Sequence, residues 1–253
     1  MGKNASPDFW DNQWDVKNFE KIIRNGKNNR LIIKTTTNFI HPDKSKRVLE
    51  AGCGNGQFVY AFDELGYDSY GIDYAPKTIS RIKEIFFNLK VSVGDVRKID
   101  FPDNYFDGYW SIGVIEHFYE GYIPIITELK RVIKPRGFLF ISFPHLSLLR
   151  KIKIKLKCYP IFNNTILEKE EFYQFALDHN QIIEEMQNNN FVLLQKTPYS
   201  GTKGLKDEIA FLKPILQKIY DSKNIFVRIF NYGLSLILSR FSSHAILLVF
   251  RKK

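Results

Sequence analysis

A short apolar run that ends in three closely spaced glycines constrains the fold of this 253-residue chain more than any other feature. The run from Arg47 to Ala51 (RVLEA) predicts a β-strand, and the turn Gly52-Cys53-Gly54-Asn55-Gly56 follows it directly. Phe58 to Leu65 then has the apolar spacing of a helix. A strand, a glycine-rich turn and a helix in this order predict the first unit of an α/β protein, whose turn lets a ligand approach the backbone and the N–H groups of the helix.

The alternation of apolar runs and helical patterns continues beyond this unit, as is typical of βαβ units and a mostly parallel sheet. It loosens after Pro144. Strands are predicted at residues 47–51, 69–73, 89–93, 106–114, 137–143, 191–196 and 244–251, and helices at 58–65, 78–87, 122–133, 170–187, 206–220 and 225–241. The last two helices therefore fall between the sixth and seventh strands.

The positive charge of the chain is unevenly distributed. Lys and Arg number 37 against 27 Asp and Glu, a net charge of +10. Residues 41–145 hold 13 basic and 14 acidic residues, whereas residues 1–40 hold 7 and 4 and residues 146–253 hold 17 and 9. The segment with the glycine-rich turn is therefore nearly neutral, and the basic flanks are the parts that would meet an anionic partner. An apolar content of 44% excludes a chain that is disordered throughout.

Cysteine usage and the first residues bear on metal binding and location. Cys53 and Cys158 cannot form a disulfide framework or a four-ligand zinc site, so no metal is expected. The N-terminal residues lack the apolar segment of a signal peptide. We therefore expect a cytoplasmic protein, with peripheral membrane contact as an open alternative.

An acidic residue closes the second predicted strand. Asp73 lies 21 positions after Gly52, the spacing at which a carboxylate meets ribose hydroxyls in doubly wound folds. The dinucleotide fingerprint would place a third glycine at position 57, where Gln57 stands. A nucleotide-bearing ligand is therefore indicated, and a pyrophosphate at this turn is disfavoured.

Five short motifs follow one another in order through the same region. They are VLEAGCGNG at 48–56, Gly71-Ile72-Asp73, Gly94-Asp95-Val96, Phe106-Asp107 with Ile115-Glu116-His117, and LKRVIKPRG at 129–137. In this order they resemble the class I S-adenosylmethionine-dependent methyltransferases of the small-molecule, methyltransferase type 11-like kind. The resemblance implies a Rossmann-like α/β fold: a seven-stranded, mostly parallel sheet with an antiparallel last strand and a helical insertion near the C-terminus.

The resemblance also implies a domain plan and a cofactor site. Residues 1–40 would form an N-terminal helical lid, residues 41–197 the S-adenosylmethionine-binding core, and residues 198–253 a helical cap insertion and the last strand. Glycine backbone would lie against the methionine part of S-adenosylmethionine, with acidic side chains on its ammonium, ribose and adenine. The residues implied to bind the cofactor are Glu50, Gly52, Cys53, Gly54, Gly56, Asp73, Tyr74, Asp95, Val96 and Ser111.

Two histidines are candidate catalytic bases. An oxygen acceptor carries a proton that must leave during methyl transfer, whereas an amine acceptor need not lose one beforehand. His117 follows the fourth predicted strand and is the first candidate; His145, after the fifth strand, is the second. A histidine that merely packs the following loop remains the alternative for His117.

The acceptor is expected to meet elements outside the core. We expect methyl transfer to an oxygen, less readily a nitrogen, of a small, glycan-linked or lipid-linked acceptor. Segment 171–175 is expected to begin a helix, and its aromatic side chains are expected to line the acceptor pocket. Nucleic acid is not expected, because Ser111-Ile112-Gly113-Val114 stands where base-amine methylases carry an Asn/Asp-Pro-Pro-aromatic element. Two alternatives stay open: an RNA or protein methyltransferase that uses the basic flanks, and a non-catalytic cofactor-binding subunit of a partner enzyme.

The last of the predicted helices, 225–241, is amphipathic and basic. It carries a stripe of large apolar residues together with Arg228 and Arg240 and no acidic residue. Its apolar stripe is expected either to face the protein as a cap over the acceptor site or to lie in an anionic membrane interface. The stripe consists of Phe226, Phe230, Leu234, Ile237 and Phe241.

Overall fold

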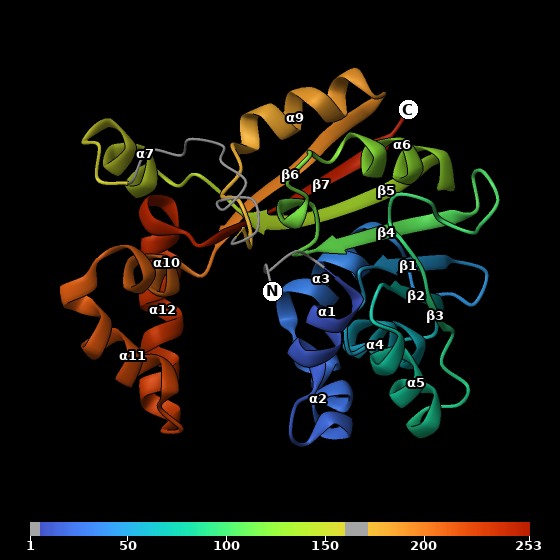
Figure 1. The fold of residues 1–253 in the computed structure, drawn as a ribbon, viewed down its shortest axis with the longest axis horizontal. Coiled ribbons are helices and arrows are strands. Elements are labelled where there is room, and N and C mark those ends of the chain that lie inside the picture. Colours follow the sequence, from blue (N-terminus) through green and yellow to red (C-terminus); the bar gives the residue numbers. More distant parts are fainter. Residues whose placement is uncertain (1–5, 160–171) are drawn as a thin grey trace.

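A seven-stranded sheet forms the middle layer of the computed structural model, which describes residues 6–159 and 172–253 (Figure 1). The strand order is β3-β2-β1-β4-β5-β7-β6, and β7 is antiparallel to both of its neighbours whereas the other pairs are parallel. The predicted mostly parallel sheet with an antiparallel last strand is confirmed. The strands are β1 (Arg47–Ala51), β2 (Asp68–Asp73), β3 (Val91–Val93), β4 (Phe106–Ile112), β5 (Ile133–Pro144), β6 (Phe191–Tyr199) and β7 (Ala245–Lys252).

Helices cover both faces of the sheet. The N-terminal helices are α1 (Pro7–Trp14), α2 (Phe19–Asn25), the short η1 (Gly26–Asn28) and α3 (Arg30–Phe39). The helices between strands are α4 (Gln57–Glu64), α5 (Pro76–Ile85), the short η2 (Ile115–His117), α6 (Ile123–Val132), α7 (Leu148–Lys155) and α9 (His179–Asn188). The helices between β6 and β7 are α10 (Gly201–Glu208), the short η3 (Ala210–Leu212), α11 (Lys213–Asp221) and α12 (Ile225–Ser242).

The alternation of side chains along the strands divides the core into two layers. Val48 packs on one face of the sheet with residues of α3 and α4, and its neighbour Leu49 packs on the other face with residues of α6 and α9. Both side chains are fully buried. This period of two is why a strand buried on both faces reads as a continuous apolar run in the sequence.

The segment before α9 differs from the predicted helix over residues 170–187. Residues 172–178 are not helical; the only regular pairing there is a bridge between His145 and Leu177. The backbone carbonyl of Tyr173 accepts a hydrogen bond from a ring nitrogen of His117, and the N–H of Phe175 donates to the carbonyl of Glu116. These partners hold the segment extended against η2, so the helix begins only after its Asp178 N-cap. Residues 170 and 171 lie outside the described residues.

In the described residues, three α-helices and the short η1 precede the first strand, in the region predicted as a helical lid. The first of them, α1, is fastened to α5 by one buried carboxylate. Asp11 Oδ1 accepts hydrogen bonds from the Thr78 N–H at 2.8 Å and the Thr78 hydroxyl at 3.0 Å, and Asp11 Oδ2 accepts from the Lys77 N–H at 3.3 Å. The residue before α5 is Ala75, which has no side chain able to cap a helix. Asp11 therefore serves as a long-range N-cap and fixes α1 over the sheet edge.

Replacing Asp11 by Ala leaves the N–H groups of Lys77 and Thr78 without their partner. The expected result is a loss of about 1–2 kcal/mol in the free energy of unfolding, the usual effect of removing a helix cap. Urea denaturation measures it. Asp8→Ala is the matched control, because the Asp8–Lys77 pair is exposed and contributes little. Equal stability of the two variants would contradict a capping role for Asp11.

Candidate functional site

The candidate site lies where the carboxyl ends of the parallel strands meet. β1 and β4 are neighbours that lead to opposite sides of the sheet, so their carboxyl ends frame the switch point at which α/β proteins bind ligands. A cavity of about 400 Å³ opens there. It is lined by eight of the predicted residues: Glu50, Gly52, Cys53, Asp73, Tyr74, Asp95, Val96 and His117.

The glycine-rich turn is shaped by close contacts. Gly52 and Gly54 both have positive φ, +80° and +50°, which favours glycine. A Cβ on Gly52 would lie 2.5 Å from a methyl carbon of Val114, and one on Gly54 would lie 2.4 Å from the ring of Trp14. Gly54 and Gly56 are not among the residues that line the cavity. Trp14 of α1 therefore covers the turn at Gly54, and the turn faces the cavity through Gly52, Cys53 and Asn55.

Asp73 ties the end of β2 to this turn. Its Oδ2 accepts a hydrogen bond from the Gly54 N–H at 2.7 Å, and its Oδ1 accepts from the Ala75 N–H at 3.0 Å. Burial raises the pKa of the Asp73 carboxyl, although these two donors oppose the change. Each carboxylate oxygen has a second lone pair, so the group can also accept hydrogen bonds from two ribose hydroxyls.

Glu50 presents an unpaired carboxyl oxygen to the cavity. The residue is buried, and among the residues that the structure describes its Oε2 has no hydrogen-bond partner. Burial and the nearby carboxylate of Asp73 raise its pKa well above the ordinary value. An orphan carboxyl at this position fits a ligand that brings a cation, such as the ammonium of S-adenosylmethionine.

The adenine side of the cavity is partly occupied by a salt bridge. Asp95 and Val96 both line the cavity, but the two oxygens of Asp95 pair with the guanidinium of Arg97, with a shortest distance of 2.6 Å. Burial would raise the pKa of Asp95, yet the hydrogen bonds from Arg97 hold it below its ordinary value. An adenine amine at Asp95 would therefore share this carboxylate with Arg97. Tyr74 lines the cavity beside them and is about two-fifths exposed.

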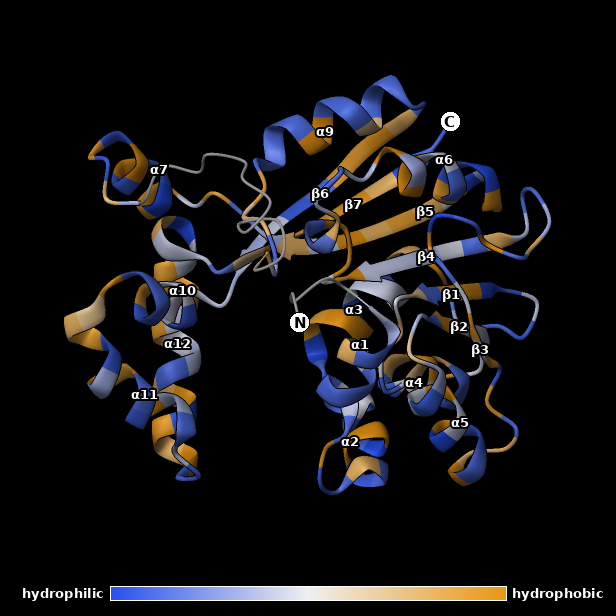
Figure 2. Cartoon of the chain, viewed as in Figure 1, coloured by the Kyte–Doolittle hydropathy of each residue, from blue (hydrophilic) through white to orange (hydrophobic). Residues whose placement is uncertain are grey.

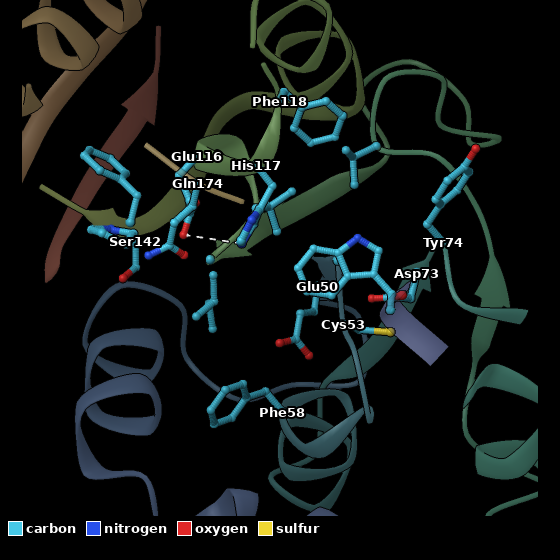
Figure 3. Close-up of a pocket in the computed structure, with 18 of the residues that line it drawn as sticks. Glu50, Cys53, Phe58, Asp73, Tyr74, Glu116, His117, Phe118, Ser142 and Gln174 are labelled. Atoms are coloured by element: carbon cyan, nitrogen blue, oxygen red, sulfur yellow. Dashed lines mark ion pairs between the residues drawn. The ribbon is translucent and has the colours of Figure 1, made fainter. Parts of the chain in front are cut away.

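His117 faces the cavity from the opposite side to Glu50 (Figure 3). Its ring is held edge-on between Trp10 and Tyr173, with ring centroids 4.8 and 5.0 Å away. Its Nδ1 lies 2.7 Å from the carbonyl oxygen of Tyr173, which can only accept. The proton of the neutral ring is therefore on Nδ1, and Nε2 is left with a free lone pair. Burial lowers the pKa of His117, so this neutral form prevails near pH 7.

Glu116, next to His117, was quoted within a motif but was not predicted as a site residue. It lines the cavity, is almost fully buried, and within the described part of the chain its Oε2 has no hydrogen-bond partner. Burial raises its pKa to about 8. Its Oε1 lies 4.0 Å from His117 Nε2. A neutral carboxylic acid and a neutral imidazole thus lie side by side at one end of the cavity.

The structure does not bring His145 or Ser111 to the cavity. His145 Nε2 lies 2.7 Å from the hydroxyl of Ser243 and its Nδ1 3.2 Å from Nδ1 of His179. Burial, and then the charge of His179, lowers the pKa of His145 to about 3. Since both ring nitrogens are engaged, we do not assign His145 as a base. The Ser111 side chain is buried within the sheet, and neither residue lines the cavity.

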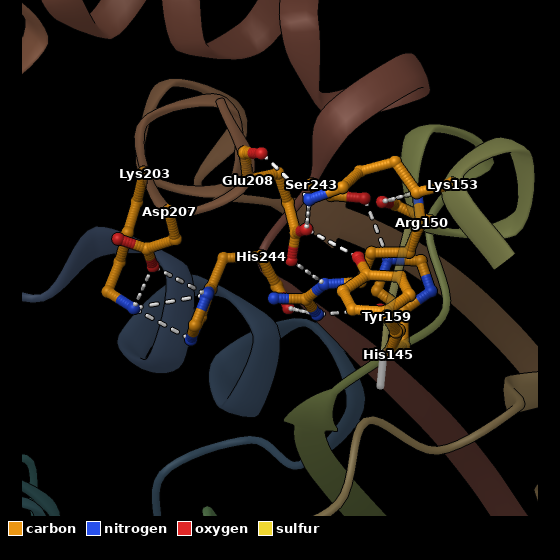
Figure 4. A network of polar contacts seen from close by, with 10 residues as sticks. His145, Arg150, Lys153, Tyr159, Lys203, Asp207, Glu208, Ser243 and His244 are labelled. Atoms are coloured by element: carbon orange, nitrogen blue, oxygen red, sulfur yellow. Dashed lines mark hydrogen bonds and ion pairs between the residues drawn. The ribbon is translucent and has the colours of Figure 1, made fainter. Parts of the chain in front are cut away.

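His145 belongs instead to a polar network that joins α7 and α10 to the ends of β5 and β7 (Figure 4). Arg150 donates to the backbone carbonyls of His145 and His244, at 2.8 and 3.2 Å, and pairs with Glu208 at 2.8 Å. Burial alone would raise the pKa of Glu208, but hydrogen bonds from Lys153, Tyr159 and Arg150 lower it to about 2. The network fixes the wall of the cavity to the helices that follow it.

Several residues that line the cavity carried no signal in the sequence. Tyr199 ends β6 and His244 precedes β7, and they reach the cavity because β7 pairs with both β5 and β6. The hydroxyl of Tyr199 lies 2.6 Å from that of Ser142 on β5. Trp10 and Trp14 belong to the segment predicted as an N-terminal helical lid, and both line the cavity. The aromatics of segment 171–175 contribute Tyr173 to it.

The fold and the site together define a Rossmann-like protein with a cavity at the switch point of its sheet, the place where such folds bind nucleoside cofactors. Residues 49–141 match the family described as Methyltransferase domain. The chain resembles a solved S-adenosylmethionine-dependent methyltransferase from Methanosarcina mazei with a TM-score of 0.58 and 16% identity, over 86% of this chain and 96% of that one. At this identity the likeness shows the shared fold.

Curated relatives match in the same region. The chain is 27% identical over 105 residues to a Mycolicibacterium smegmatis protein named as a probable S-adenosylmethionine-dependent methyltransferase, covering 42% of this chain and 40% of that protein. It is 31% identical over 99 residues to the 2-methyl-6-phytyl-1,4-hydroquinone methyltransferase of a Synechocystis strain, covering 38% of this chain and 31% of that protein. The chain thus spans less than half the length of these two relatives.

Residues 49–141 thus match a methyltransferase domain, and they lie within a fold that the chain shares with solved methyltransferases. S-adenosylmethionine is the cofactor that such a domain implies. The cavity fits that cofactor on three counts. Its orphan carboxyl at Glu50 suits the ammonium, its Asp73 carboxylate suits the ribose, and its open backbone at Gly52 suits the methionine chain.

Replacing Glu50 by Gln removes the partner expected for the cofactor ammonium. Affinity for S-adenosylhomocysteine, which carries the same ammonium, should fall about tenfold or more, a range typical for loss of a charge-assisted hydrogen bond. Because Glu50 has a raised pKa and must ionise to pair with a cation, binding to the wild-type chain should release protons, and the number released should increase as pH falls. Calorimetric titration in buffers of different ionisation enthalpy measures both effects.

The control for this change is Glu64→Gln, at an exposed position of α4. It should bind like the wild type. Unchanged affinity in Glu50→Gln, or proton release equal to that of the wild type, would remove Glu50 from the cofactor site.

Glu116 should make the stability of the protein depend on pH. Its folded-state pKa of about 8 lies above the ordinary value of 4.5. Above pH 4.5 the unfolded chain ionises Glu116 while the folded chain keeps it protonated, so stability falls as pH rises toward about 8, by at most about 1.4 kcal/mol per unit. Urea denaturation across this range should show a shallower decline for Glu116→Gln. The exposed Glu84→Gln should follow the wild type, and parallel profiles for all three proteins would contradict the buried, protonated state.

Proposed function

We propose that the chain transfers a methyl group from S-adenosylmethionine to a hydroxyl oxygen of a lipid-linked acceptor. The observation that carries the proposal is the neutral ring of His117, which lines the cavity: its Nδ1 proton is held by the Tyr173 carbonyl, and its Nε2 keeps a free lone pair. A base with a lone pair at neutral pH is what a proton-bearing oxygen acceptor requires. A nitrogen acceptor that is already unprotonated would make no use of it.

The bound cofactor supplies an electrophilic methyl group that needs no further activation. The protein must align the acceptor oxygen with that methyl, exclude water, and accept the hydroxyl proton. In our proposal His117 Nε2 would accept the hydroxyl proton as the acceptor oxygen takes the methyl group, and the sulfur of the bound cofactor would keep the bonding pair. The sulfonium charge is thereby lost, and the positive charge moves to the imidazole.

Glu116 supports this charge transfer. A positive imidazole 4.0 Å away would lower the pKa of the Glu116 carboxyl, which burial holds at about 8 in the resting protein. The two groups would then titrate as a pair that shares one proton. Glu116 thus acts through His117 as a positioning and charge-balancing residue.

The walls of the cavity suit an apolar acceptor body. Aromatic and aliphatic side chains line most of it, and its volume of about 400 Å³ lies in the range of small-molecule sites. The Synechocystis relative is named for a hydroquinone that carries a phytyl chain, which combines a hydroxyl with a lipid tail. The aromatic rings in the wall belong to Trp10, Trp14, Phe58, Tyr74, Phe118, Phe143, Tyr173 and Tyr199.

An acceptor screen with the purified chain tests this function. Labelled S-adenosylmethionine is supplied with hydroquinones that carry or lack a prenyl chain, hydroxylated glycans, primary amines and transfer RNA. Recovery of the label as a methyl ether of a prenylated hydroquinone supports the proposal. Transfer only to amines, RNA or protein would contradict it, and absence of transfer to every acceptor, with cofactor binding intact, would favour a non-catalytic subunit.

His117→Ala should lower turnover about tenfold or more, the lower end of what a general base contributes, with affinity for S-adenosylhomocysteine unchanged. Because burial lowers the pKa of His117, the turnover of the wild type should fall only below the ordinary histidine value of about 6.5 as pH decreases. Steady-state rates across pH measure both. The control is His41→Ala, in the exposed turn before β1, and a wild-type rate for His117→Ala would reject the base.

A further inference from the structure

α12 exposes a continuous apolar surface, here called the outer apolar face. In the described residues, 24 large apolar side chains are exposed, and eleven of them fall within residues 209–243. On α12 two neighbouring rows spaced by three or four residues point outward, so they form one face. Phe226 and Ile237 are 77% and 76% exposed. The outer apolar face consists of Ile225, Phe226, Ile229, Phe230, Tyr232, Leu236, Ile237 and Phe241.

The side of α12 that packs against α10 is built largely around small polar residues. Ser239 and Ser242 are buried there, against α10. A Cβ on Gly201 would lie 2.5 Å from the carbonyl oxygen of Ser235, and one on Gly204 would lie 1.7 Å from that of Ser242. The two helices therefore approach through glycine, and the large side chains have no room between them. This pattern reverses the usual arrangement of an amphipathic helix, whose apolar side faces its own core.

Of the two expectations for the apolar stripe, a cap over the acceptor site or a membrane interface, the exposure of its side chains favours the second. Phe226, Phe230, Ile237 and Phe241 are all exposed and only Leu234 is half-buried, so most of the stripe does not pack on the protein. Figure 2 shows apolar residues along α11 and α12, which stand apart from the helices around the sheet. Within the described ranges no helix is both long and apolar enough to cross a membrane.

Positive charge surrounds the outer apolar face. Residues 209–243 hold five basic residues and one acidic residue, Asp221. In the part of the chain that the structure describes, none of the five takes part in an ion pair. They are Lys213, Lys218, Lys223, Arg228 and Arg240. A second copy of the chain on this face would bring like charges together, whereas an anionic surface would neutralise them.

We propose that α11 and α12 form a peripheral membrane-binding surface for anionic lipids. The outer apolar face enters the boundary between headgroups and acyl chains, and the five cations meet the headgroup phosphates. Both terms act together, because neither a few apolar side chains nor a few charges alone hold a protein on a bilayer. The proposal stands independently of the acceptor, since it rests on surface shape and charge.

Flotation of the full chain with vesicles tests the proposal. Vesicles of phosphatidylcholine alone are compared with vesicles that contain about one third phosphatidylglycerol. The wild type should float with the anionic vesicles and not with the neutral ones, and high salt should release it. The triple variant Phe226→Ser, Phe230→Ser, Ile237→Ser should lower partitioning about tenfold or more.

Two further variants keep the test decisive. Phe87→Ser with Ile123→Ser removes exposed apolar side chains elsewhere and should bind like the wild type. Arg228→Glu with Arg240→Glu changes only exposed charge and should lose binding to anionic vesicles even if the triple variant unfolds, which circular dichroism would show. Absence of vesicle binding, equal binding to neutral vesicles, or a lipid-free dimer in sedimentation that the triple variant abolishes would overturn the proposal. None of these readouts involves methyl transfer.

Discussion

Two hydrogen bonds to the carboxylate of Asp73 hold the cofactor end of the molecule together. They come from Gly54 in the first turn and from Ala75 after the second strand. Because one side chain fixes both backbones, the distance between the glycine turn and the ribose position is set before any ligand arrives. The same turn supports Trp14 of α1, whose ring covers Gly54. The glycine turn, the end of β2 and the α1 side chain that covers the turn are therefore all positioned by Asp73.

The site is also organised by two carboxyl groups that are buried without a full set of partners. Glu50 and Glu116 lie at different ends of one cavity, and burial raises the pKa of each. A buried polar atom without a partner costs free energy in the unliganded protein, and a ligand that supplies the partner recovers it. The two ends of the cavity differ in their surroundings: Glu50 lies near the carboxylate of Asp73, whereas Glu116 lies beside the ring of His117.

Much of the fold and less than a third of the residues that line the cavity could be predicted from the sequence, because their signals are local. The glycine turn, the period of the strands and the acidic residue that closes β2 lie within about 30 residues of one another. Tyr199 and His244 reach the cavity because β7 pairs in antiparallel fashion with its neighbours. β7 lies about 100 residues after β5 in the chain, so no local sequence pattern indicates this pairing. The periodicity of α12 likewise showed a stripe but not its direction, since an inward and an outward stripe have the same spacing. The late helix was predicted too early because backbone partners on η2 override its propensity.

The short connection between α12 and β7 joins the outer apolar face to the wall of the cavity. α12 ends at Ser242, and His244, which lines the cavity, follows after a single residue. Both Ser242 and Ser243 are buried, and the carbonyl of His244 is held by Arg150. Because this connection is short and well packed, a shift of α12 along its axis would also move His244 in the wall of the cavity. Binding at the outer apolar face would therefore change the shape of the cavity.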